Sequence, residues 1–410
     1  MRNNDKGSLK NNLESGMNTQ EYINRGNQVI MPTYSRFPIV FDHGDGCILT
    51  DIEGKQYIDC VGGIAVNCLG YNHAGLNQVI EKQIHKMLHV SNLYWNVPMI
   101  TAAEKLVKLS GLDKAFFCNS GAEANEAAMK LARIYSKLYK SKDATEIIAM
   151  QDSFHGRTYA AITATGQAKY QKNLDPLVPD ITHVPFNDFE ALEKAVDKYN
   201  CAAILLEPIQ GEGGIYPADQ EYLKKVRKLC DDQNIVLIFD EVQCGIGRTG
   251  KFFAYQHYGI KPDVVAFAKG IAGGIPMGGI LACDRVAQVF TPGTHASTFG
   301  ANPLATSAAN YVLNTVGNPE FLKDVSEKSQ YFAQKLSELK DVNPHIKDIR
   351  GKGLMIGVEI DEDVSSVINQ CIQSGLLVCG AGHSTVRFVP PLIIGKEEID
   401  KVVQIFAESL

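Results

Sequence analysis

The sequence predicts an α/β fold, in which a large, mostly parallel sheet is flanked by helices and a smaller α+β domain is built from both ends of the chain. The first observation is the alternation of short apolar runs with helical patterns from about residue 110, which is typical of parallel sheets. The second is that residues 18–75 are rich in Gly, Asp and β-branched residues, which predicts short antiparallel strands. The third is that residues 316–410 mix helical and strand patterns.

The large domain is expected to span residues 76–315, and the smaller domain to combine residues 17–75 with 316–410. Residues 1–16 are polar and poor in large apolar side chains, so we expect a disordered leader, with Met17 as a possible natural start. The strands expected in the large domain are 114–119, 146–150, 202–208, 235–241 and 264–268, and the helices expected between them include 120–139, 190–200 and 220–232. A flexible glycine stretch is expected at 270–279.

The composition is that of an ordinary globular protein with 410 residues, of which 45 % are apolar and 21 % are charged. The net charge of -6 gives no indication of binding to nucleic acid or to an anionic membrane. No apolar run reaches the roughly 18 residues of a membrane helix, and the N-terminus lacks the apolar block of a secretory signal. Ten cysteines are scattered without a C-x-x-C pair, which favours buried, reduced thiols in a cytoplasmic protein over disulfides or a metal site.

Open α/β sheets bind ligands beyond the carboxyl ends of their strands. The chemically distinctive residue in such a position is Lys269, which follows a fully apolar strand and precedes the glycine stretch. Burial would lower the pKa of its amine and favour the neutral, nucleophilic form. Asp240 ends another apolar strand, and its cationic partner could be Lys269 or a protonated ring nitrogen of a cofactor. The alternative for Lys269 is a side chain that reaches the surface.

Two further segments complete a possible cofactor site. Ser120 and Glu123 form an S-x-x-E capping box, and Gly121 lets another group approach the first helical turn, which would suit a phosphate. Plain helix capping is the commoner explanation of that pattern. Phe154 could stack on a ring or simply pack in the core. A nucleophilic lysine, an acid and a phosphate site are together what pyridoxal phosphate (PLP) requires.

The chain resembles the class III, fold-type I, PLP-dependent aminotransferases, and within them the acetylornithine aminotransferases. The resemblance runs from about residue 17 to residue 410 and rests on blocks whose order and spacing agree: 34–70, SNLYW (91–95), 116–133, FHGRTYAAITATG (154–166), LEPIQGEGGI (206–215), 238–274, GTHASTFGANPLA (293–305) and VRFVPPL (386–392). It implies a fold-type I architecture with the large domain holding PLP, and a homodimer whose active site is shared across the interface.

The resemblance also implies a role for each matching residue. Lys269 would be joined covalently to the cofactor and would move protons, and Asp240 would hold the ring nitrogen protonated. Gln243 would contact the phenolic oxygen and Phe154 would stack on the ring. The phosphate would be bound by Ser120, Gly121 and Ala122, and by Thr298 of the other subunit.

Substrate binding is expected at four other positions. Arg157 would bind the distal carboxylate of the substrate and Arg387 the α-carboxylate of glutamate, because a guanidinium grips a carboxylate with two hydrogen bonds. Glu212 would pair with Arg387 when the substrate presents its ω-amine and would turn away for glutamate. Ser297 is expected beside the substrate, whereas Glu207 is interpreted as structural.

The implied reaction is a ping-pong transfer of the δ-amino group of N-acetyl-L-ornithine to 2-oxoglutarate, in arginine synthesis. Ornithine, succinylornithine and 4-aminobutyrate remain alternative amino donors, although Ile64 stands where ornithine-specific relatives tend to carry a tyrosine. A catalytically silent relative is disfavoured because Lys269, Asp240 and both arginines are present. No metal is expected.

A nucleotide-binding protein is the remaining alternative, because residues 245–250 fit G-x-G-x-x-G and 245–251 fit the start of a P-loop. Phe252 stands where a P-loop requires Ser or Thr. For the dinucleotide fingerprint, five residues intervene between strand and glycines and no acid follows about 20 residues later. The glycines and Arg248 are therefore expected to shape a loop near the cofactor mouth.

Overall fold

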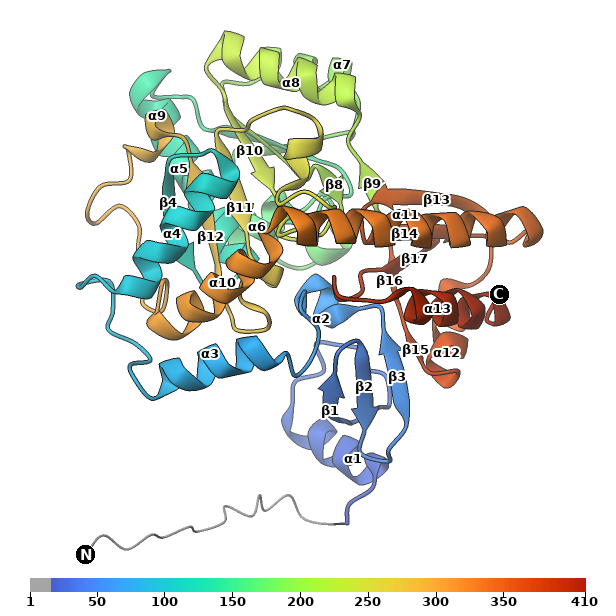
Figure 1. The fold of residues 1–410 in the computed structure, drawn as a ribbon. Helices are drawn as coiled ribbons and strands as arrows, with labels where there is room; N and C mark the ends of the chain where they lie inside the picture. The colour runs from blue at the N-terminus through green and yellow to red at the C-terminus, as the bar shows by residue number, and fades with distance from the viewer. Residues whose placement is uncertain (1–15) are drawn as a thin grey trace, which may run out of the picture.

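The computed structural model describes residues 16–410, so all but the last residue of the leader expected at 1–16 lies outside the described part (Figure 1). Its centre is a seven-stranded sheet in which only β12 runs antiparallel to its neighbours. The strands are, in spatial order, β4 (Lys114–Cys118), β12 (Gly278–Ala282), β11 (Val264–Phe267), β10 (Val236–Asp240), β7 (Cys201–Leu206), β5 (Glu146–Met150) and β6 (Ile181–Val184). All five strands expected for the large domain are therefore present.

Helices cover both faces of this sheet because its strands are apolar on both sides. In β10, Leu237 and Phe239 face one buried cluster, whereas Val236 and Ile238 face the other. The first cluster is covered by α4 (Val97–Ser110), α7 (Phe189–Lys198), α8 (Gln220–Gln233) and α10 (Pro303–Val316). The second is covered by α5 (Gly121–Tyr139), α6 (Tyr159–Ala164) and α9 (Asp284–Ala287). This is the predicted α/β architecture.

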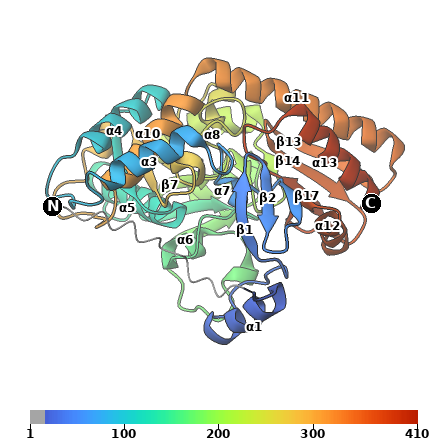
Figure 2. The same ribbon diagram turned by 60° about the horizontal axis from the view of Figure 1, so that its bottom comes forward.

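Two smaller sheets contain the ends of the chain. One joins β1 (Phe41–Asp45), β2 (Ile48–Asp51) and β3 (Gln56–Asp59) to β15 (Leu376–Leu377); the other contains β13 (Ile346–Lys352), β14 (Met355–Ile360), β17 (Thr385–Phe388) and β16 (Cys379–Ala381). The helices α11 (Pro319–Val342), α12 (Val364–Gln373) and α13 (Lys396–Glu408) accompany them on the C-terminal side (Figure 2). Because β15 pairs with β3, we propose that residues 17–75 and 316–410 form one small domain.

The remaining elements connect these layers. Two helices, α2 (Gly62–Ala65) and α3 (Ala74–Ile84), lead from the first small sheet into the large one, and α3 packs on α10. A two-stranded ribbon, β8 (Ile209–Gln210) with β9 (Tyr216–Pro217), follows β7. Short 3₁₀ turns are η1 (Ala168–Tyr170), η2 (Ala254–His257) and η3 (Lys269–Ala272).

The expectation of strands alone between residues 18 and 75 was wrong at its start, where α1 (Thr19–Val29) precedes β1. Asn18 caps this helix through a bond from the Glu21 amide, and the Glu21 carboxylate accepts from the Asn18 amide in return. This reciprocal capping is a sequence signal for a helix start. The helix was nevertheless missed in the sequence, because α1 is polar and buries none of its residues.

The stretch at 270–279 is also not wholly a flexible loop, because its last two glycines begin β12 in the middle of the large sheet. A Cβ on Gly279 would lie 2.3 Å from the carbonyl oxygen of Phe116 and 2.7 Å from the ring of Phe267. Glycine therefore stands here because neighbouring atoms leave no room for a side chain.

The cysteines are free and mostly buried, as expected from their scattered spacing. All ten cysteines are free, and only Cys283 and Cys379 are not fully buried. Within residues 16–410, no helix combines the length and the apolar character that crossing a membrane requires.

Candidate active site

The carboxyl ends of β4, β5, β7, β10 and β11 surround one cavity of about 380 Å³. The strand-end segments singled out in the sequence thus lie together in space. Eight of the expected site residues line this cavity: Ser120, Gly121, Ala122, Phe154, Arg157, Asp240, Gln243 and Lys269. Asn125, His155 and Glu207 line it as well, although no binding role was expected for them.

Lys269 lies two residues after the end of β11, at the first residue of η3. Its φ of 46° is in the left-handed region, which is uncommon outside glycine and marks a backbone held in place by its surroundings. Burial lowers the pKa of its amine, although the charge of Glu212 opposes this effect. Among residues 16–410 the amine has no hydrogen-bond or ion-pair partner. A nucleophilic amine is chemically available at the cavity wall.

Asp240 is only 3 % exposed and is held by three donors. His155 Nδ1 lies 2.8 Å and Asn125 Nδ2 lies 2.7 Å from Asp240 Oδ2, while the Val242 amide donates to Oδ1. His155 and Asn125 were missed in the sequence, because they lie 85 and 115 positions away from the acid that they contact. These three hydrogen bonds fix the orientation of the Asp240 carboxylate in the cavity wall.

The N-terminus of α5 opens into the cavity. The Ser120 hydroxyl accepts from the Glu123 amide as expected, but the Glu123 carboxylate accepts from the Asn119 amide rather than from that of Ser120, so the predicted capping box is only half formed. A Cβ on Gly121 would lie 2.7 Å from the side chain of Val242, so close packing excludes a larger residue. The first-turn amides and the positive end of the helix dipole suit an anion here.

Phe154 and Arg157 follow β5 and also line the cavity. The guanidinium of Arg157 lies 4.0 Å from the ring centroid of Tyr170 and 5.6 Å from that of Phe154. These rings hold an otherwise exposed cation at the cavity rim. Glu207 accepts from the amides of Phe154 and Gly211, which connects the two loops, and burial raises the pKa of this carboxyl.

Arg387 and Glu212 do not line the cavity but are joined to it through Gln243. Arg387 is 2 % exposed, and its Nη1 lies 2.5 Å from Glu212 Oε1 and 3.0 Å from Gln243 Oε1. Burial raises the pKa of Glu212, but the nearby guanidinium outweighs burial and holds this pKa below its usual range. Glu212 and Arg387 therefore form a charged pair beside the cavity.

Ser297 and Thr298 lie outside this cavity. The Ser297 hydroxyl accepts from Asn119 Nδ2 and from the Gly300 amide, and Thr298 is exposed. Ile64 is also exposed, with a φ of 62° that a β-branched residue rarely adopts. None of these three residues lines the cavity of the single chain.

The glycine-rich stretch at 245–250 forms successive turns, and no α-helix follows it directly. Both nucleotide-binding interpretations require a helix start after the glycines, so neither fits. Arg248 is buried and does not itself line the cavity. Its Nη1 donates to the carbonyls of Leu354 and Pro390, 3.1 and 2.5 Å away, so it joins the loop to the C-terminal segment.

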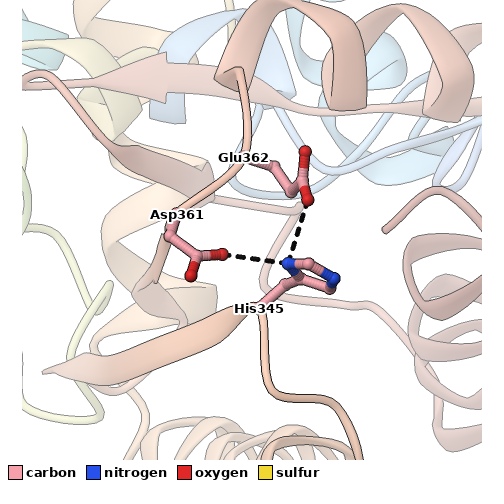
Figure 3. Close-up of side chains that lie close together, drawn as sticks. All are labelled: His345, Asp361 and Glu362. Carbon is pink, nitrogen blue, oxygen red and sulfur yellow. Dashed lines mark hydrogen bonds and ion pairs between the residues drawn. The ribbon is translucent and has the colours of Figure 1, made fainter.

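One group with metal-type ligands occurs among residues 16–410, and it lies outside the cavity: His345, Asp361 and Glu362 (Figure 3). His345 Nδ1 is 3.0 Å from Asp361 and 2.9 Å from Glu362. Asp361 is also paired with Lys347, which lowers the pKa of its carboxyl. Asp361 and Glu362 are exposed and His345 is half-buried, and ion pairing accounts for their arrangement.

The cavity residues fit PLP. Its aldehyde needs an unpaired amine, its ring nitrogen an acid, and its phosphate a cluster of amides. Lys269, Asp240 and the first turn of α5 offer these groups around one cavity.

Comparisons with known proteins agree with this geometry. The model of the class-III aminotransferase family matches residues 29–410. An acetylornithine aminotransferase from Caldanaerobacter subterraneus subsp. tengcongensis is 50 % identical over 93 % of this chain and 97 % of its own length. A solved ornithine aminotransferase from Toxoplasma gondii, with PLP partly occupying its active site, has a TM-score of 0.91 and 30 % identity over 96 % of this chain and 94 % of its own.

A solved acetylornithine aminotransferase from Elizabethkingia anophelis has a TM-score of 0.85 and 32 % identity, over 96 % of this chain and 99 % of its own. Fold, cavity and sequence similarity thus lead to the same result. The chain belongs to the class-III aminotransferase family, and it is a PLP-dependent aminotransferase.

Proposed function

We propose that the protein transfers the δ-amino group of N-acetyl-L-ornithine to 2-oxoglutarate, in arginine synthesis. Two relatives support this donor, since acetylornithine aminotransferases are 50 % and 49 % identical over 93 % of the chain. The observation that carries the proposal is the charged pair of Glu212 and Arg387 beside a cavity that holds an unpaired lysine.

The pair explains how one site serves two substrates. The ω-amine end of acetylornithine carries no carboxylate, so an unpaired Arg387 would be a costly buried charge. Glu212 neutralises it in that half-reaction. The α-carboxylate of glutamate or 2-oxoglutarate then replaces Glu212, and Arg157 binds the carboxylate at the far end of either substrate.

PLP, when bound, supplies an aldehyde that takes up the amino group and a ring that draws electrons from the reacting carbon. We assign the proton transfer at this carbon to Lys269 Nζ, which its lowered pKa makes a competent base. Asp240 holds the proton on the ring nitrogen, and Gln243 contacts the phenolic oxygen. Phe154 packs against the ring, while Ser120, Gly121 and Ala122 bind the phosphate.

The donor assignment predicts a clear order in a substrate panel with 2-oxoglutarate as acceptor. Acetylornithine should exceed ornithine in kcat/KM at least about tenfold, which corresponds to ~1.4 kcal/mol. The isoleucine at position 64 supports this order, since the Ile64 side chain cannot accept a hydrogen bond from a free α-amino group. Succinylornithine and 4-aminobutyrate complete the panel. A higher kcat/KM for ornithine or 4-aminobutyrate than for acetylornithine would overturn the choice of donor while leaving the enzyme class intact.

The same proposal includes a homodimer as the smallest working unit. A group of large apolar side chains, which we call the aromatic edge, is exposed on the single chain: Leu93, Tyr94, Trp95, Val97 and Phe299. Asn92 ties this segment to the loop that carries Thr298, through bonds to the carbonyls of Ser297 and Gly300. An apolar surface of this kind favours burial against a second copy, which would bring Thr298 to the partner's cofactor phosphate.

Replacing Trp95 with glutamate should therefore convert a dimer to a monomer, because it places charge in an interface where the indole, 83 % exposed on one chain, would be buried. Light scattering coupled to size-exclusion chromatography measures the mass directly. Leu138→Glu is the matched control, since Leu138 is an exposed leucine at the far end of α5. A wild-type monomer, or equal masses for wild type and Trp95→Glu, would contradict the dimer.

A cytoplasmic location is also part of the proposal. It is supported by the ten free cysteines, eight of them buried, because such usage is typical of reducing compartments.

A further inference from the structure

Arg387 has a third contact that the exchange between Glu212 and glutamate does not use. Its Nε lies 3.3 Å from the sulfur of Cys379. Cys379 is opposite Arg387 in the antiparallel pair of β16 and β17, so the two side chains project from the same face. On the other flank, the residue opposite Arg387 in β14 is Gly357, which has no side chain. Among the neighbouring strands, only Cys379 can therefore support the guanidinium from the side.

The three contacts use two nitrogens of the guanidinium. Glu212 and Gln243 both bind Nη1, whereas Cys379 binds Nε. With Nε engaged, a bidentate carboxylate is directed to the edge formed by Nη1 and Nη2, which is the edge that Glu212 would leave. Arg387 is 2 % exposed, so an Nε without an acceptor would lack compensation from bulk solvent.

A thiol has suitable chemistry for this position. Sulfur accepts a hydrogen bond weakly, so it orients the guanidinium without competing with a substrate carboxylate. An aspartate there would form a lasting charge-assisted pair with Arg387 and would oppose substrate binding. Burial lowers the pKa of Arg387, but the neighbouring Cys379 and Glu212 outweigh burial and raise it above its usual range. The arginine stays charged.

We propose that Cys379 is a positioning residue for the α-carboxylate of the amino acceptor, acting through Arg387. This inference rests on the proposed exchange of Glu212 for that carboxylate. In the donor half-reaction Glu212 itself fixes Arg387, and the thiol adds little. In the acceptor half-reaction Glu212 has left, and only Gln243 and Cys379 hold the guanidinium against rotation. The contribution of the thiol is therefore specific to 2-oxoglutarate and glutamate.

The test is a steady-state comparison of the wild-type holoenzyme with Cys379→Ala and Cys379→Ser. Cys379→Ala should raise KM for 2-oxoglutarate about 3- to 10-fold, as expected for loss of one hydrogen bond to a charged group. KM for acetylornithine and kcat should change less than about twofold. Cys379→Ser should raise this KM much less than Cys379→Ala does, because a hydroxyl also accepts a hydrogen bond from Nε.

Cys283→Ala is the matched control, since Cys283 is the other incompletely buried cysteine and its thiol contacts Asp263, away from the cavity. It should leave both KM values unchanged. An unchanged KM for 2-oxoglutarate in Cys379→Ala, or equal rises in both KM values, would overturn the role of Cys379. An effect of the same size in Cys283→Ala would do so too. A wild-type enzyme that rejects 2-oxoglutarate with every donor would overturn the proposed function and this inference together, so the two failures are distinguishable.

Discussion

Replacing Lys269 with alanine is expected to abolish transamination, with kcat falling by at least about a thousandfold. The amine is both the nucleophile that faces the cavity and the base assigned to proton transfer, and among residues 16–410 no second lysine lines the cavity. Cofactor uptake should persist, because Asp240 and the first turn of α5 are unchanged. Measuring kcat together with bound PLP after dialysis separates the two effects.

Lys251→Ala is the control for this variant, since Lys251 is an exposed lysine that does not line the cavity. Its kcat should match that of the wild type. Turnover of Lys269→Ala within about tenfold of the wild type would show that another group performs the chemistry.

The second large effect is expected for Asp240→Asn, which should lower kcat by at least about a hundredfold. The amide has the size of the carboxylate but lacks the charge that keeps the cofactor ring nitrogen protonated. It also places an amide within reach of the donors Asn125 and His155, so some of the present hydrogen bonds would be lost. Stopped-flow measurement of each half-reaction should show that both are slowed.

Glu241→Gln provides a matched comparison one residue further along the chain. Glu241 is fully buried and accepts from the amides of Ala254 and Tyr255, and burial raises the pKa of its carboxyl to about 7. It does not line the cavity, so the variant should alter stability more than kcat. If Glu241→Gln slowed catalysis as much as Asp240→Asn, the assignment of the ring acid to Asp240 would be lost.

Much of the candidate site could be predicted because its residues follow apolar strands. Lys269 and Asp240 stand at the ends of buried strands, and parallel topology brings such ends to one edge of a sheet. The alternation of strand and helix that revealed this topology is a local pattern in the sequence. Five of the seven strands of the large sheet were therefore accessible from the sequence; the two that were missed are β6 and β12, and the glycines of β12 carry no strand signal.

The partners of these residues could not be predicted, because they depend on contacts between distant segments. Asn125 lies on the alanine-rich face of α5, and nothing in its neighbours indicates that it reaches Asp240. Arg248 was expected in a loop near the cofactor, but no local pattern indicates that its guanidinium donates to carbonyls more than 100 positions away. The contact of Cys379 with Arg387 requires the register of β16 with β17, which the sequence does not specify.

Covalent attachment of the cofactor to the amine of Lys269 can be mapped by reduction and peptide mass spectrometry. The purified holoenzyme is reduced with sodium borohydride, digested and mapped by mass spectrometry. We expect a cofactor-derived mass on the peptide that contains Lys269 and on no other lysine. An unmodified Lys269 peptide from PLP-saturated enzyme, or the added mass on a different lysine, would contradict it.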